Sequence, residues 1–243
     1  MPKPNCIELP DCEPIPILFE DRSVLAVDKP RGWMLVPHTW QKTSRNLQAA
    51  ITSSIAAGDF WARSRGLKCL RHVHRLDADT SGILLFAKSP GAVDVISDLF
   101  ESRRMEKTYL AVVMGEPKQT EWTCQLQLGP DPRQFGRMQV DVRGGKDAET
   151  RFTIRETRGE FTLVEAKPVT GRTHQIRVHL AACGLPIVGD PLYGRPENKL
   201  PLGLRAVRLA FVNPFTKNRV DIRAPQEDFL RQFGFGASPS PGA

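Results

Sequence analysis

The spacing of apolar residues along the chain predicts many short strands, separated by turns and a few helices. Strand-length apolar or alternating stretches occur at residues 23–30, 83–87, 108–115, 122–128, 150–157, 161–168, 204–215 and 219–225. Helical spacing occurs at residues 44–57, 90–105, 173–183 and 226–233. Because strands outnumber helices and mostly follow one another as hairpins, we expect an α+β fold with a mixed, largely antiparallel β-sheet core and flanking helices.

Two of the predicted helices carry recognisable end signals. Pro90 stands near the first turn of the second helix, with Val93, Ile96 and Phe100 down one face. Gly184 follows the third helix, where a glycine is typical of a left-handed cap.

The organisation of the chain is predicted to be simple. Residues 1–15 are rich in proline and are expected to be irregular, and residues 234–243 are predicted to be a disordered tail. No repeat or linker interrupts the stretch between them, so residues 16–233 are predicted to form a single domain.

Composition narrows the functional class. No apolar run approaches the roughly 18 residues of a membrane span, and the N-terminus has no apolar signal-peptide core. The five cysteines are scattered without a CxxC motif, which favours a reducing compartment. With the lack of an apolar span, this predicts a cytoplasmic protein with no membrane partner. The 34 Lys and Arg against 27 Asp and Glu leave a net charge of +7, which favours a polyanionic partner, nucleic acid first.

Charged residues stand directly before the buried strand in the stretch HVHRLDADTSGILLFAKS, residues 72–89. A loop held by a buried strand is rigid while its side chains face solvent, which suits a reactive group. Asp77 is the candidate for that group, whereas we expect Asp79 to cap the following Thr-Ser-Gly turn.

A second cluster lies in GRTHQIRVHLAACGLPIVGDPLYG, residues 171–194. On a helix from residue 173, His174 and Arg177 share one face, while Ile176, Leu180 and Cys183 take the inner one. Cations crowd the first turns of this helix, where the helix dipole disfavours them unless an anion lies nearby.

Two further positions have both a structural and a functional interpretation. Tyr109, near the start of the strand 108–115, is a core aromatic residue or part of a site. Lys29 lies in VDKPRGWMLVPH, residues 27–38, which is a basic turn or a loop that touches phosphate.

These four clusters together resemble a known family. HRLDADTSGILLFAKS is similar to the signature of the RluA-type RNA pseudouridine synthases, and the other three clusters follow that family's order and spacing over residues 16–230. The resemblance implies the pseudouridine synthase fold with an RNA-binding cleft. It also implies an isomerase that converts uridine to pseudouridine in an rRNA or tRNA stem-loop, as a monomer without metal or cofactor.

The resemblance also assigns roles to individual residues. Asp77 is implied to be the nucleophile on a flipped-out uridine, Arg177 its ion-pair partner, and Tyr109 the residue that lines the base pocket. Arg75 matches the position that fills the vacated space in the RNA. Further substrate contacts are expected from Lys29, Lys107, Arg172, His174 and Ile176. The Arg-rich loop 129–147 is expected to help select the RNA.

Departures from the family pattern and two rival functions complete the sequence-based picture. Leu204-Arg205-Ala206 replaces a common Leu-His-Ala, Asp28 replaces a common Asn, and we expect no N-terminal RNA-binding module. One rival is a metal-dependent hydrolase that uses His72, His74 and Asp77. The other is a catalytically inactive RNA-binding protein.

Overall fold

The computed structural model describes residues 2–10, 12–35, 45–195 and 200–236 and divides the chain into two compact units. Unit 1 comprises Met1–Glu106 and Arg208–Ala224, and unit 2 comprises Lys107–Val207 and Pro225–Ala243. The single domain expected over residues 16–233 stays a prediction. Residues 36–38 of the early motif, residue 44 of the first predicted helix and residues 237–243 of the predicted tail lie outside the described residues.

Unit 1 is built on antiparallel strands that follow one another in space as β1-β2-β3-β5, with β4 also paired to β5 and β13 paired to β12. Their bounds are β1 Cys6–Ile7, β2 Ile15–Glu20, β3 Val24–Lys29, β4 Arg71–His72, β5 Ser81–Ala87, β12 Leu204–Val212 and β13 Arg219–Arg223. β12 begins in unit 2 and ends in unit 1.

The segment 1–15 therefore departs from its predicted irregular structure, because β1 lies within it and pairs with β2. The strand β2 had no clear sequence signal, since Pro16 cannot donate a ladder hydrogen bond. Pro16 is tolerated because it faces only the two-residue strand β1, opposite Cys6.

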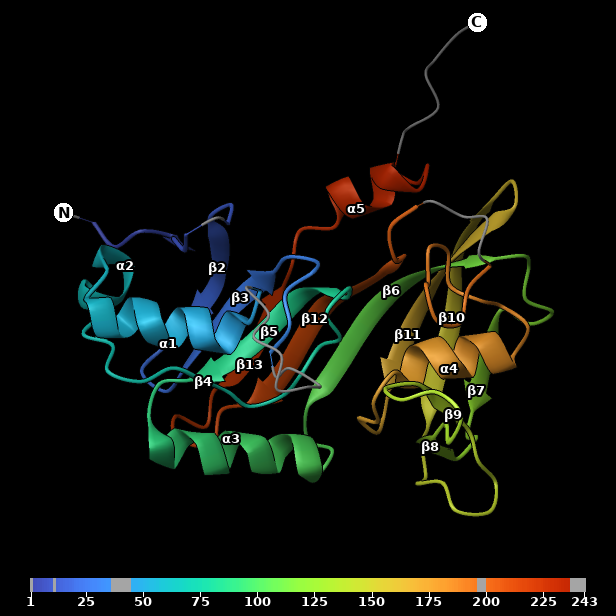
Figure 1. Ribbon diagram of the computed structural model, residues 1–243, viewed down its shortest axis with the longest axis horizontal. Helices are drawn as coiled ribbons and strands as arrows, with labels where there is room; N and C mark the ends of the chain where they lie inside the picture. Colours follow the sequence, from blue (N-terminus) through green and yellow to red (C-terminus); the bar gives the residue numbers. More distant parts are fainter. Residues whose placement is uncertain (1, 11, 36–44, 196–199, 237–243) are drawn as a thin grey trace, which may run out of the picture. The chain divides into compact units, whose positions relative to one another are not determined.

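The described part of unit 1 contains three helices; the start predicted near Pro90 fits α3, which ends at Glu101, before the predicted residue 105 (Figure 1). Their bounds are α1 Leu47–Ala57, α2 Phe60–Arg63 and α3 Pro90–Glu101. Ser89 caps α3 by accepting a hydrogen bond from the Ala92 amide, and Pro90 occupies its first turn. The fully buried positions of α3 are Ala92, Ile96 and Leu99; the predicted face members Val93 and Phe100 are only partly buried.

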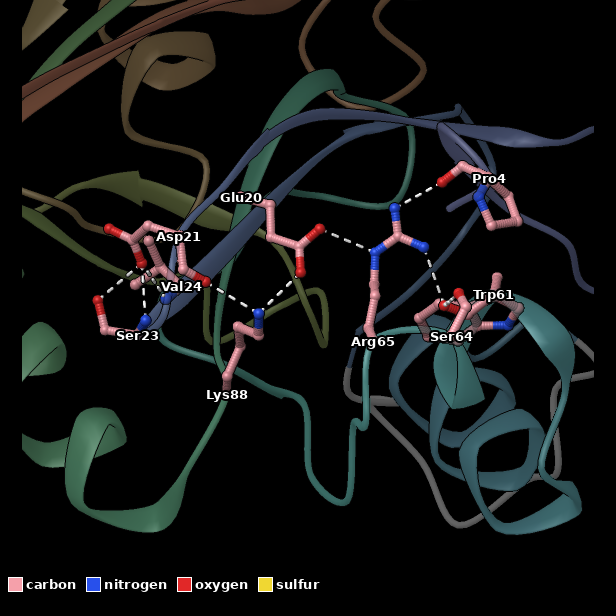
Figure 2. A network of polar contacts seen from close by, with 9 residues as sticks. All are labelled: Pro4, Glu20, Asp21, Ser23, Val24, Trp61, Ser64, Arg65 and Lys88. Atoms are coloured by element: carbon pink, nitrogen blue, oxygen red, sulfur yellow. Dashed lines mark hydrogen bonds and ion pairs between the residues drawn. The ribbon is translucent and has the colours of Figure 1, made fainter. Parts of the chain in front are cut away.

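An ion-pair network around Glu20 ties β2 to two other segments of unit 1 (Figure 2). Glu20 accepts hydrogen bonds from Arg65 Nε at 2.9 Å and from Lys88 Nζ at 2.8 Å. Arg65 also donates to the carbonyls of Trp61 and Pro4, and Lys88 donates to the carbonyl of Asp21. Burial raises the pKa of Glu20, but the hydrogen bonds and charges of Lys88 and Arg65 outweigh it and hold that pKa below its ordinary value.

Glu20→Gln is expected to lower the free energy of unfolding by about 1–2 kcal/mol at pH 7, because the two cations lose their charged acceptor. A carboxyl group whose pKa is lower in the folded state stabilises the protein above its unfolded pKa, roughly 4.3, and loses that effect as the pH falls through the folded value. Urea unfolding of both proteins between pH 6 and pH 3 checks this. A gap between them that stays constant down to pH 3 would contradict the assignment.

Unit 2 contains an antiparallel sheet in the order β6-β11-β10-β7 and a separate pair, β8-β9. The bounds are β6 Glu106–Met114, β7 Glu121–Cys124, β8 Leu128–Pro130, β9 Met138–Val140, β10 Thr150–Arg158 and β11 Phe161–Pro168. The mixed, mostly antiparallel sheets with few helices confirm the predicted α+β class. The strand predicted over 122–128 ends earlier, at Cys124.

Helix α4 (Gln175–Ala182) packs against β10 and β11 in unit 2 (Figure 1). It begins two residues later than predicted, because His174 adopts a left-handed conformation (φ 54°) and stands outside the helix. Gly184 is left-handed (φ 76°), as its position after the helix predicts. Cys183 is exposed and not on the inner face, since the helix ends before it.

The last helix, α5 (Glu227–Gln232), brings aromatic residues into the core of unit 2. Phe229, Phe233 and Phe235 are buried with Leu110 and Val112 of β6. The predicted tail from residue 234 is therefore corrected, because Phe235 is completely buried. Among the residues that the structure describes, no helix is long and apolar enough to cross a membrane.

Candidate active site

The candidate nucleophile Asp77 lies in the loop between β4 and β5 of unit 1 and is half-buried. Its carbonyl accepts a hydrogen bond from the Thr80 amide at 3.2 Å, which closes a turn. Every residue of β5 is buried, so the strand after the loop is rigidly held. Gly82 enters β5 with φ 110°, a conformation that favours glycine. The turn thus lies at residues 77–80, earlier than the predicted Thr-Ser-Gly turn, because Ser81 and Gly82 already belong to β5; the capping role of Asp79 stays a prediction.

The side chain of Lys29 holds the β4–β5 loop through hydrogen bonds to its backbone. Lys29 is completely buried, and its ammonium donates hydrogen bonds to the carbonyls of Ala78 at 2.8 Å, Thr80 at 2.9 Å and Pro30 at 3.0 Å. Burial lowers the pKa of Lys29 to about 8, and the charges of Asp79 and Asp77 oppose that shift. Two of the three hydrogen bonds thus hold the backbone on both sides of Asp79, and the third joins Lys29 to Pro30.

The prediction that Lys29 contacts substrate stays a prediction. The structure shows a side chain with no exposed surface whose ammonium donates to three carbonyls, an arrangement that suits a residue that positions the loop. The sequence did not reveal this, because a lysine before a proline turn is ordinarily exposed. Arg75, in contrast, is exposed, as a residue that enters RNA requires.

Lys29→Met is expected to slow a reaction at Asp77 about 10- to 100-fold. Without the hydrogen bonds from Lys29, the loop can shift, and a displacement of the Asp77 carboxylate by about 1 Å is enough for such a loss. Single-turnover rates of the two proteins measure this. Lys88→Met is the matched control, since it removes a lysine of unit 1 that contacts Glu20 and not the loop. It is expected to lower stability and leave the rate unchanged. An unaltered rate in Lys29→Met would contradict the positioning role.

In unit 2, the guanidinium of Arg177 lies on α4 and forms a buried, bidentate ion pair with Asp190. Arg177 Nε and Nη2 donate to Asp190 Oδ2 and Oδ1, each at 2.8 Å, and both side chains are almost completely buried. The amides of Leu192 and Tyr193 also donate to Asp190 Oδ1, at 2.9 and 3.1 Å. Burial raises the pKa of Asp190, but the hydrogen bonds and charge of Arg177 outweigh it and lower that pKa below its ordinary value.

Asp190 is a residue that the sequence analysis missed. The cations at the start of the helix predicted a nearby anion. The structure shows that this anion is Asp190, in the stretch GDPLYG, which forms an ion pair with Arg177. The cluster of cations thus indicated that an anion lies nearby, but nothing in GDPLYG identified Asp190 as that anion. The predicted ion pair between Asp77 and Arg177 stays a prediction.

Lys107 contacts the loop that precedes α4, and Arg172, which belongs to that loop, ties it to the segment before β10. Lys107 Nζ donates to the carbonyl of Thr170 at 3.0 Å, and burial lowers its pKa to about 8. Arg172 donates from Nε to the carbonyl of Asp147 at 2.9 Å. Gln175, which is buried, accepts from the Thr170 hydroxyl and the Arg172 amide and so fixes the same loop.

His174, Ile176 and Tyr109 are the remaining predicted site residues of unit 2. His174 is buried, and its Nδ1 forms a hydrogen bond with the Tyr193 hydroxyl at 2.9 Å. Ile176 is buried in the cluster against which the half-buried Tyr109 packs. Tyr109 lies on β6 opposite Ala166 of β11. Both interpretations of Tyr109 thus remain compatible with its position, because it contacts the core and is still partly exposed.

The histidines proposed as metal ligands are engaged in other interactions. His74 Nε2 accepts a hydrogen bond from the Leu85 amide at 3.0 Å, and the ring stacks on Phe100. His72 Nδ1 lies 2.8 Å from Gln48 Oε1. Within the described residues, no three His, Cys, Asp or Glu side chains gather as a metal site. The metal-dependent hydrolase is not supported.

The Arg-rich loop 129–147 contains a feature that the sequence did not predict, the hairpin formed by β8 and β9. The loop between these strands exposes Phe135 (83%) and the side chain of Arg133 (84%). An exposed aromatic ring and an exposed guanidinium on the same loop offer stacking and charge to a nucleic acid strand.

Comparison with known proteins adds independent findings. The sequence model of the family described as RNA pseudouridylate synthase matches residues 23–182. The ribosomal large subunit pseudouridine synthase C of Yersinia pestis is 37% identical over 232 residues, which cover 92% of this chain and 68% of that protein. An uncharacterized RNA pseudouridine synthase of Chloroflexus aurantiacus is 44% identical over 156 residues, 63% of this chain and 49% of that protein.

A solved structure is similar as well. The human RNA pseudouridylate synthase domain containing 1 superposes with a TM-score of 0.70 at 26% identity, over 88% of this chain and 84% of the human one. The family match includes Asp77, Tyr109 and Arg177. It therefore spans residues of both units.

Proposed function

This chain belongs to the RNA pseudouridylate synthase family, and from that premise we propose that Asp77 is the nucleophile that converts a uridine of RNA into pseudouridine. Membership confirms the resemblance seen in the sequence and makes the chain an RNA pseudouridine synthase, an isomerase. The observation that supports the role of Asp77 is its placement on a loop pinned to buried Lys29 and to the buried strand β5.

The proposed reaction conserves the atoms of the uridine. The bond between N1 of uracil and C1′ of ribose breaks, the base turns, and C5 bonds to C1′. C5 loses its proton, and N1 gains one. The Asp77 carboxylate forms a transient covalent bond to C1′ or to the uracil ring, and both possibilities require its ionised form. The isomerisation involves no net oxidation or reduction, so it calls for no redox cofactor.

Three other residues complete the proposed site. Arg177 is proposed to supply a positive charge to the reaction, and Asp190 holds its guanidinium in a fixed plane. Tyr109 presents its ring to the uracil. Flipping the uridine out of the RNA costs a few kcal/mol. Arg75, which is exposed, is proposed to occupy the space that the uridine leaves.

The net charge of +7 supports binding to the RNA backbone. We propose that the exposed Arg133 and Phe135 of the β8–β9 hairpin contribute to it. Arg172 contributes from its half-exposed position beside Asp147.

The target is proposed to be large-subunit rRNA, because relatives that share most of this chain carry that substrate in their names. A tRNA stem-loop is the alternative target. We further propose that the protein acts as a monomer in the cytoplasm.

Pseudouridine mapping of total RNA from cells with and without this gene tests the proposal. One or a few large-subunit rRNA positions are expected to lose pseudouridine in the deletion strain and to regain it with the wild-type gene, but not with Asp77→Asn. Loss confined to tRNA would support the alternative target. An unchanged map would contradict the proposed activity, and RNA binding by such a protein would favour the inactive RNA-binding class.

A further inference from the structure

Tyr193 contacts both members of the buried ion pair in unit 2. Its ring centroid lies 5.2 Å from the guanidinium carbon of Arg177, and its backbone amide donates to Asp190 Oδ1 at 3.1 Å. Asp190 Oδ1 is the same oxygen that accepts from Arg177 Nη2. The position of Tyr193 therefore bears directly on the plane of the Arg177 guanidinium.

The same tyrosine contacts the β8–β9 hairpin. Its hydroxyl accepts a hydrogen bond from the Met138 amide of β9 at 2.8 Å, and its ring centroid lies 5.2 Å from the guanidinium carbon of Arg137. The ring packs with Met138 and Val140 against the buried cluster of Leu128, Ala148 and Val178. A shift of the hairpin would thus displace three different contacts of Tyr193.

The hydroxyl of Tyr193 also holds a strained residue. Burial raises its pKa above the ordinary value, so the hydroxyl keeps its proton at neutral pH. Besides accepting from the Met138 amide, it forms a hydrogen bond with His174 Nδ1, at 2.9 Å. His174 has φ 54°, which costs a non-glycine residue of order 1–3 kcal/mol and persists only where the surroundings impose it. His174 directly precedes α4, the helix that carries Arg177.

We infer that Tyr193 is a positioning residue, through which the β8–β9 hairpin sets the orientation of the Arg177 guanidinium. The inference rests on the proposed function, in which Arg177 serves the reaction at Asp77. The hairpin tip exposes Arg133 and Phe135, so RNA seated there is linked to Arg177 through Met138, Arg137 and the tyrosine ring. The orientation of the Arg177 guanidinium then depends on how the RNA binds to the hairpin. An RNA that binds there correctly would therefore react faster than one that does not.

The test uses Tyr193→Phe, which keeps the ring on both arginines and loses the two hydroxyl hydrogen bonds. With a saturating transcript of large-subunit rRNA, we expect the single-turnover rate constant to fall about tenfold and the RNA Kd to stay within twofold. Phe233→Leu is the matched control, since it disturbs an aromatic residue of unit 2 in a buried cluster that does not include Tyr193. It is expected to lower Tm and leave the rate constant unchanged.

A second measurement needs no activity. The Nε–H signal of Arg177 in the free protein, assigned by its loss in Arg177→Lys, is expected to shift in Tyr193→Phe and in Arg137→Met. Arg137→Met also covers the case in which the tyrosine variant does not fold. An unmoved signal in both variants would overturn the inference, whether or not the rate falls, because Tyr193 would then act elsewhere.

These results separate the inference from the proposed function. If the wild-type protein converts no uridine, the proposed function fails, and the Arg177 signal still decides whether Tyr193 orients it. If the wild type is active and Tyr193→Phe keeps its rate within twofold, the inference is wrong and the proposed function stands.

Discussion

Asp77→Asn is expected to reduce the conversion of uridine to pseudouridine at least about 10⁴-fold, because the amide cannot form the covalent bond that the carboxylate forms. The fold is expected to persist, since the loop is held by its backbone carbonyls on Lys29 and by β5, and not by the Asp77 carboxylate alone. Single-turnover conversion and RNA affinity, measured on the same preparation, check both halves of this expectation.

Asp79→Asn is the matched control for charge. It removes one carboxylate from the same loop, also near Lys29, but two residues from the proposed nucleophile. We expect it to reduce the rate less than about tenfold, as a turn residue would. Conversion by Asp77→Asn at a rate near wild type would remove Asp77 from the mechanism.

The Arg177–Asp190 pair carries the second large effect. Arg177→Met and Asp190→Asn are each expected to lower the free energy of unfolding by about 3–5 kcal/mol, because each leaves an uncompensated charge in the core. The double variant is expected to lose much less than the sum. Its asparagine still accepts from the Leu192 and Tyr193 amides, and no charge remains buried. Urea unfolding of the four proteins gives the coupling energy.

The same variants also distinguish a structural role of Arg177 from a catalytic one. If Arg177 serves the reaction, the double variant recovers stability but stays inactive. The exposed pair Arg231–Asp228 is the matched control, and the same substitutions there are expected to show no measurable coupling. If the losses of unfolding free energy at Arg177 and Asp190 are additive, the two side chains do not stabilise the protein as a pair. Recovered activity in the double variant would remove Arg177 from the site.

Much of the fold could be predicted from periodicity. β5 is an uninterrupted apolar run, and α3 carries both a Ser-Pro start and an apolar stripe. Both signals are local, so they are visible without knowing what packs on them. Segments without such signals were missed: β2 carries a proline, and β8 and β9 are three-residue strands within a polar loop.

The candidate site was predictable in part. Asp77, Tyr109 and Arg177 follow from motifs of characteristic order, and the family match confirms the resemblance on which they rest. The roles of Lys29 and Asp190 could not be predicted, because both depend on contacts between distant residues. Lys29 meets Ala78 and Thr80 about fifty positions away, and Asp190 meets Arg177 only after the chain turns past Gly184.

By itself, the sequence determined the fold class, the enzyme family and the candidate nucleophile, since apolar periodicity and motif order are written along the chain. The tertiary structure alone decided which charges are buried and what each one contacts. Burial removes water as a partner, so a lysine or an aspartate inside the protein must find carbonyls or a guanidinium. Which ones it finds depends on segments that only folding brings together.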